Sequence, residues 1–82
     1  MVRGGGYGIG LTQASNVTVT NNWVGMDYHG LELANITGAT ITGNKLGAPT
    51  PISGNQAGNT FSNNTTLIGN YSNGYPGAPT LF

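Results

Sequence analysis

The sequence GIGLTQASNVTVTNNWVG, residues 8–25, returns after a short interval as GLELANITGATITGNKLG, residues 30–47. The two copies align without a gap at a spacing of 22 residues, so that glycines match at both ends and Val19 falls on Ile41. A repeat of this length is typical of stacked architectures, in which each unit covers its apolar side with the next unit. The sequence therefore predicts a chain built from similar coils.

A partial third copy lies further along the chain, where NTFSNN, residues 59–64, repeats the pattern of VTVTNN and ATITGN. Before it comes APTPISGNQAG, residues 48–58, which is rich in proline and glycine. We expect this segment to form a turn or a small excursion from the stack. The predicted organisation is a glycine-rich entry at 1–7, coils at 8–29, 30–51 and 52–70, and an extended tail at 71–82.

Within each copy, apolar residues alternate with polar ones, which indicates β-strands. Val17 and Val19 flank Thr18, so we expect the valines to face a core and to stack on the same position of the next coil, about 4.8 Å away. The threonines then face outward. They form two predicted columns, Thr18, Thr40 and Thr60, and Thr20, Thr42 and Ser62.

Asparagines end the same strand in each copy, at Asn22, Asn44 and Asn64. We expect them to form a structural ladder, because stacked side-chain amides bond to one another and to the backbone of turns. With this ladder and the pattern GIGLTQASNVTVTNNWV, the chain resembles the right-handed parallel β-helix, or pectate-lyase-like, family. The resemblance implies an all-β fold, a short right-handed parallel β-helix of two to three coils of about 22 residues, with an extended C-terminal tail.

The family contains polysaccharide lyases, glycoside hydrolases, epimerases, adhesins and the tailspikes of bacteriophages, which are usually homotrimers. This short chain looks most like a C-terminal segment of a tailspike. The resemblance implies a structural and assembly segment of a host-surface-binding protein that supports trimer stability, contacts a surface polysaccharide, and resides in a virion tail or outside the cell. The expected partner is a homo-oligomer or a longer parent chain, because a short stack leaves strand edges unpaired.

The end of the chain departs from the coil pattern. NYSNGYPGAPTLF, residues 70–82, ends on Leu81 and Phe82. An apolar end after an extended segment with proline fits an arm that packs on a neighbouring chain, and a frayed terminus is the alternative.

Charge and cysteine content exclude several functions. Only 5% of the 82 residues are charged and the net charge is zero, so the basic patch that nucleic acids or anionic membranes require is missing. There is no cysteine, and a single histidine with two acids offers no zinc set. We therefore expect no metal, no cofactor and no nucleic-acid partner, and no run of residues is apolar for long enough to span a membrane.

Catalysis, the first alternative, would require Asp27 and Glu32, the two carboxylates of the chain. A depolymerase that hydrolyses glycosides needs two carboxyl groups about 5 to 9.5 Å apart, and a lyase needs a base and a cation. The repeat places Glu32 outward on a strand, level with Gly10, and Asp27 in the preceding turn. The structural alternatives are that Asp27 caps turn amides or pairs with Arg3, and that Glu32 is a solvated strand residue.

Aromatic side chains favour binding over catalysis. Trp23, Tyr28, His29 and Tyr7 are candidates for glycan binding or a subunit interface, because aromatic faces beside amides and hydroxyls suit sugars. His29 aligns with Tyr7, which predicts a stacked pair, and a lyase base is the alternative. Trp23 aligns with Lys45 in an outward position, where a subunit contact is preferred. Ice binding by the threonine columns is a third function to consider.

Overall fold

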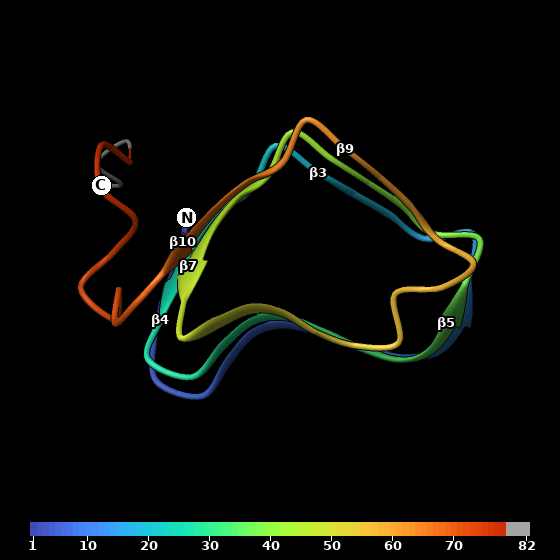
Figure 1. Cartoon of the computed structure of the whole chain (residues 1–82), viewed down its shortest axis with the longest axis horizontal. Coiled ribbons are helices and arrows are strands. Elements are labelled where there is room, and N and C mark those ends of the chain that lie inside the picture. Colours follow the sequence, from blue (N-terminus) through green and yellow to red (C-terminus); the bar gives the residue numbers. More distant parts are fainter. Residues whose placement is uncertain (79–82) are drawn as a thin grey trace.

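The computed structural model describes residues 1–78, which wind into a parallel β-solenoid of about three coils. Figure 1 looks along the stack, so that successive coils lie over one another. The strands are β1 Val2–Gly4, β2 Tyr7–Ser15, β3 Thr18–Thr20, β4 Trp23–Met26, β5 His29–Thr37, β6 Thr40–Thr42, β7 Lys45–Ala48, β8 Thr50–Gly54, β9 Thr60–Ser62 and β10 Thr65–Ile68.

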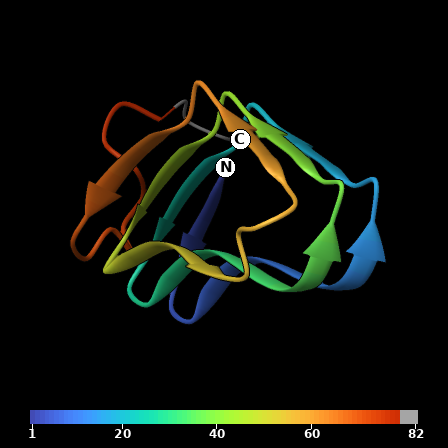
Figure 2. The same ribbon diagram turned by 45° about the vertical axis from the view of Figure 1, so that its right-hand side comes forward.

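Each coil contributes one strand to each of three parallel sheets. Sheet A has the order β1-β4-β7-β10, sheet B has β2-β5-β8 and sheet C has β3-β6-β9. Figure 2 shows the strands of each sheet side by side, one coil apart. The predicted all-β parallel β-helix is therefore confirmed.

Strand pairing follows the predicted repeat. Val19 pairs with Ile41 at a spacing of 22 residues, and Ile41 pairs with Phe61 at a spacing of 20. The two threonine columns of sheet C also align, and the Ser62 hydroxyl donates to Thr42 Oγ1 at 3.0 Å. The two columns extend over three rungs and form a small face. Ice binding by this face stays a prediction.

The core is a single apolar column inside the coils. The most deeply buried side chains come from the second coil and from its neighbours in sheet A, and they are under 2% exposed: Val24, Leu31, Leu33, Ile36, Ile41 and Leu46. The middle coil is buried because it has a coil on each side, whereas several apolar residues of the first and third coils, among them Leu11, Ile52 and Phe61, are only partly buried. Burial thus falls from the middle of the stack toward both ends.

An asparagine ladder runs beside this core. Asn44 is fully buried, and its Oδ1 accepts bonds from the backbone N–H and the side-chain amide of Asn22, both at 3.0 Å. The Asn44 N–H and Nδ2 in turn donate to Asn64 Oδ1, and Nδ2 also donates to the Val19 carbonyl. Each asparagine therefore ties the turn of its coil to the turn of the coil beside it.

Segment 48–58 is largely part of the stack, so the predicted excursion is wrong for most of its length. Ala48 ends β7, and Thr50–Gly54 forms β8, which pairs with β5. Thr50 donates its N–H to the Tyr28 carbonyl, so alternation turns the nitrogen of Pro51 to the free edge of sheet B, where a missing donor breaks no ladder bond. The coil is shortened at residues 55–58, where the chain steps inward in Figure 1.

The described part of the tail packs on the outside of sheet A. Tyr71 donates its N–H to the Met26 carbonyl, and the Asn73 carbonyl accepts a bond from Arg3. A Cβ on Gly25 would lie 2.4 Å from the Tyr71 carbonyl oxygen, so the tail fits only because this position lacks a side chain. The tail thus covers its own sheet, while Leu81 and Phe82 lie outside the described residues. Residues 1–78 also contain no helix long and apolar enough to cross a membrane.

Replacing the central asparagine should cost far more than replacing the first. Asn44→Ala removes bonds that satisfy the Asn22 N–H and the Val19 carbonyl, and we expect it to lower the free energy of unfolding by about 3 kcal/mol. Asn22→Ala, at the half-exposed end of the ladder, is the matched control, with an expected loss below about 1.5 kcal/mol. Urea unfolding measures both, and equal losses would contradict the central role of Asn44.

A methyl group at Gly25 should release the tail. Gly25→Ala places a carbon against backbone atoms of Tyr71 and Tyr75, and we expect a loss of about 1–3 kcal/mol together with exposure of Trp23, which contacts Tyr75. Trp23 is the single tryptophan, so its fluorescence reports tail release. Gly10→Ala is the control, because a Cβ there meets nothing within 4 Å. Similar emission spectra for the two variants would show that Gly25 does not hold the tail.

Candidate functional site

Three aromatic rings gather where sheet A turns into sheet B. Tyr28 stacks on His29 with ring centroids 3.8 Å apart, and Tyr7, from the preceding coil, lies 5.0 Å from His29 and 5.6 Å from Tyr28. Tyr7 and Tyr28 are 55% and 52% exposed, whereas the His29 side chain is 14% exposed. These three residues are called the aromatic patch below. The two tyrosine rings face solvent and largely cover the ring of His29. The predicted pairing of His29 with Tyr7 is seen in the register of β2 and β5.

A glycine column interrupts the strand pairing beside the patch, because Tyr7 pairs with His29 and Ile9 with Leu31 but the two glycines between them are not paired. Strict alternation along β5 would put His29 and Glu32 on opposite faces, because they are three residues apart. A Cβ on Gly8 would lie 2.4 Å from a Val24 methyl group, and a Cβ on Gly30 would lie 2.6 Å from the Pro51 carbonyl oxygen, so this corner is closed to side chains. The regular alternation of the strand is interrupted here. His29 and Glu32 therefore meet on one face.

Glu32 lies beside two polar neighbours. Its Oε2 lies 2.9 Å from His29 Nδ1, and Ser53 faces it from β8. The Ser53 hydroxyl bond is the main cause that lowers the pKa of Glu32 below its ordinary value of 4.5, and the bond and charge of His29 act in the same direction against partial desolvation. At neutral pH this side chain is a carboxylate, able to accept hydrogen bonds beside the aromatic patch.

Asp27 is not part of the contact between His29 and Glu32, and it does not pair with Arg3. Its Oδ1 accepts the Gly6 N–H at 3.0 Å, so it caps a turn amide of the preceding coil, as one of the sequence interpretations proposed. Arg3 instead donates to the Asn73 carbonyl. Among residues 1–78, His29 and Glu32 form the one contact within 4.0 Å between a basic and an acidic side chain.

Trp23 lies apart from the aromatic patch, on sheet A. The Lys45 ammonium lies over its ring, 5.1 Å from the centroid, and Tyr75 of the tail meets it edge-on at 5.5 Å. The tryptophan is half-buried by contacts within its own chain, and the subunit contact that the sequence favoured stays a prediction. The structure therefore groups Tyr7, Tyr28, His29 and Glu32 and separates Trp23 from them.

The sequence did not single out Ser53 or the contact between His29 and Glu32. The third-coil register could have indicated Ser53, since it follows Gly10 and Glu32 in one column of sheet B. The histidine contact depends on the interrupted strand pairing at Gly30, which no repeat pattern reveals. In the described part of the chain, no three histidine, cysteine or acidic side chains gather as a metal site.

No protein-family model, curated protein or solved structure matches this chain. The parallel β-helix is established by the structure itself, and the likeness to pectate-lyase-like proteins and tailspikes stays a prediction.

The lowered pKa of Glu32 has a testable cause. Ser53→Ala should move the pKa of Glu32 up toward 4.5, whereas Ser62→Ala, which removes a hydroxyl from sheet C, should leave it unchanged. A lowered folded-state pKa stabilises the protein above the unfolded value, and this stability is lost as the pH falls from about 4.5 through the folded pKa. Glu32→Gln should flatten that acid-side loss. NMR titration of the Glu32 carboxyl carbon checks the cause, and an unchanged midpoint in Ser53→Ala would refute it.

Proposed function

We propose that this chain is the β-solenoid segment of a tailspike-like host-surface-binding protein and that its aromatic patch, with Glu32, binds a surface carbohydrate. The observation that supports this most is the pair of exposed tyrosine rings beside a fixed carboxylate. Aromatic faces pack on the C–H faces of sugar rings, and a carboxylate accepts bonds from sugar hydroxyls. The patch therefore combines the two contacts that carbohydrate binding needs.

The charges around the patch favour neutral or amino sugars over uronates. Lys45 lies over Trp23 on sheet A, and Arg3 is bonded to the tail. Among the described residues, neither cation is placed beside Glu32, whose own negative charge repels an acidic sugar. A sugar with hydroxyl, acetamido or amino groups suits this site better.

The same features make a depolymerase the weaker alternative. A hydrolase needs one protonated carboxyl as a general acid, whereas hydrogen bonds favour the ionised form of Glu32. Asp27, the other carboxylate, is engaged by the Gly6 N–H in a turn. A lyase would need a cation at the substrate carboxylate, which Arg3 and Lys45 do not provide at this place.

Removing one tyrosine face should weaken carbohydrate binding. A panel of neutral and amino-sugar oligosaccharides from bacterial surface polysaccharides can be screened by NMR, with shifts expected at Tyr7, Tyr28 and Glu32. Tyr28→Ala should raise the Kd of a binding oligosaccharide about tenfold, since loss of an aromatic contact costs roughly 1–1.5 kcal/mol. Thr18→Ala, on the outer face of sheet C, is the control and should bind as the natural chain does.

Two results would reject this proposal. One is a complete panel that leaves the signals of Tyr7, Tyr28 and Glu32 unmoved at millimolar concentration. The other is binding that Tyr28→Ala and Thr18→Ala affect equally. Reducing-end release that disappears in Glu32→Gln would instead support the depolymerase.

A further inference from the structure

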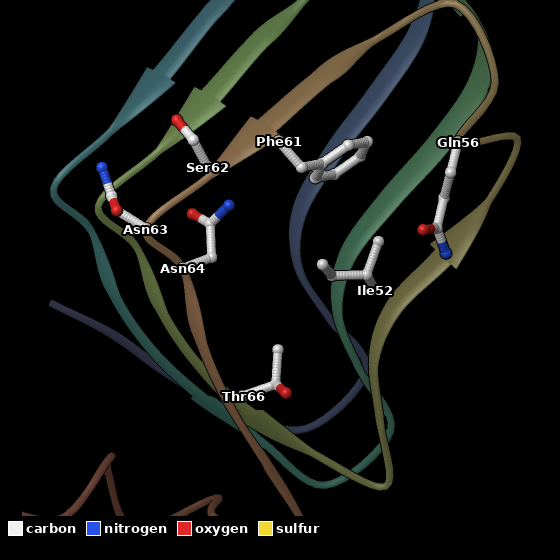
Figure 3. Close-up of a pocket in the computed structure, with 7 residues that line it drawn as sticks. All are labelled: Ile52, Gln56, Phe61, Ser62, Asn63, Asn64 and Thr66. Carbon is white, nitrogen blue, oxygen red and sulfur yellow. The ribbon is translucent and has the colours of Figure 1, made fainter.

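The two ends of the solenoid expose unpaired strand edges. At the upper end, defined by β8, β9 and β10, there is a depression of about 340 Å³. Ile52, Phe61 and Thr66 point into it, as Figure 3 shows, and none of its lining residues is charged. The lower end is defined by β1, β2 and β3. Its apolar residues Leu11 and Val17 are also only partly buried.

The asparagine ladder gives these two ends opposite polarity. Inside the stack, the N–H and Nδ2 of one asparagine donate to the Oδ1 of the asparagine in the following coil. At the lower end, Asn22 Oδ1 accepts no bond from residues 1–78, and at the upper end the Asn64 N–H finds no acceptor among them. The acceptor left over at one end therefore matches the donor left over at the other.

An exposed isoleucine marks the upper end as an unfinished core. Ile68 of β10 pairs with Ala48, which is fully buried, and Met26 precedes Ala48 in the same inward position. Ile68 thus belongs to an interior column, but it is 80% exposed because no coil follows it. A large aliphatic side chain in this position gains most when another apolar rung covers it.

We propose that the upper end of one chain binds the lower end of a second copy, which continues the β-helix head to tail. In this arrangement β2 and β3 of the second copy lie over β8 and β9. Asn22 of the second copy then accepts from Asn64, which adds one step to the ladder. The contact is heterologous, since different surfaces meet, so that it propagates rather than closing at two chains.

Sheet A has one strand more than sheet B or sheet C, which affects how two copies can join. β1 and β10 both belong to sheet A, so residues 1–78 contain three coils and one additional strand. When β2 and β3 of the second copy dock, the β10 of the first chain comes to lie beside the β4 of the second copy. The second copy's own β1 occupies that place in the free chain, so the two strands compete for it. β10 is the stronger occupant, because it brings Thr66 and Ile68 to the positions of Val2 and Gly4. The incoming chain therefore releases its β1.

Sheet B contributes least to this contact. Pro51 lies in β8, the free edge strand, and has no N–H to donate to an added strand. A proline on an edge limits indiscriminate pairing with other β-strands. Specificity then comes from the ladder, from sheet C and from Ile68 in sheet A.

Sedimentation velocity over a concentration series tests this proposal. We expect the average mass of the natural chain to rise continuously with concentration. Ile68→Lys should shift the onset of association at least tenfold higher in concentration, since it places a charge in an apolar contact. It should fold normally because Ile68 is exposed. Thr40→Lys, which puts the same charge on the outer face of sheet C in the middle coil, away from both ends, is the control and should associate as the natural chain does.

Mixing variants distinguishes the head-to-tail contact from the alternatives. Val17→Lys blocks the lower end and Ile68→Lys blocks the upper end. At a concentration where the natural chain associates, each variant alone should stay monomeric, while their mixture forms a dimer limited to two chains. In that dimer, the amides of Val2–Gly4 in one chain should lose protection from hydrogen exchange. The proposal is wrong if the natural chain is monomeric at millimolar concentration, or if it stops at a dimer or a trimer. If Val17→Lys fails to fold, the sedimentation results for the natural chain and for Ile68→Lys still test the proposal.

Discussion

In this protein, each residue of a strand must lie over the equivalent residue of the preceding coil, one rung along the stack. The parallel ladders of three sheets enforce this, because a slip by one residue would turn the apolar column outward. The chain keeps the register at Val19, Ile41 and Phe61 even though the spacing falls from 22 to 20 residues. The third coil shortens its loop at 55–58 so that the strands on either side remain aligned. Loop length is thus adjustable, and strand register is not.

The same constraint explains the low charge of the sequence. Side chains of one column lie about 4.8 Å apart, so like charges in neighbouring coils would repel strongly. Arg3 is followed by Gly25, Lys45 lies beside Trp23, and Glu32 lies between Gly10 and Ser53. Each of these three charges thus has an uncharged neighbour in its column. Asparagine and threonine fill the other polar positions because their columns attract rather than repel, as in the ladder of Asn22, Asn44 and Asn64.

The sequence predicted what the repeat determines and missed what interrupts it. Alternation and the 22-residue spacing gave the strands, the alignment of Tyr7 with His29, and the outward position of Glu32. The contact between His29 and Glu32 depends on the interrupted strand pairing at Gly30, and the docking of the tail depends on the bare backbone at Gly25. In both places a glycine leaves room for neighbouring backbone atoms, and the periodicity of the sequence does not show which glycines do this. The contact of Tyr75 with Trp23 was missed for the same reason, since the tail has no repeat of its own.

The aromatic patch and the two ends of the stack occupy different surfaces, which lets their proposed roles combine. The patch lies on the side of the solenoid, at the corner of sheets A and B, while association uses strand edges at the top and bottom. A head-to-tail stack would leave Tyr7 and Tyr28 uncovered and repeat them every three rungs, about 14 Å apart. A polysaccharide lying along the stack would meet several patches at once. Weak contacts at each patch would then add through effective concentration, so that a site with only two tyrosines and one carboxylate could hold a polymer firmly.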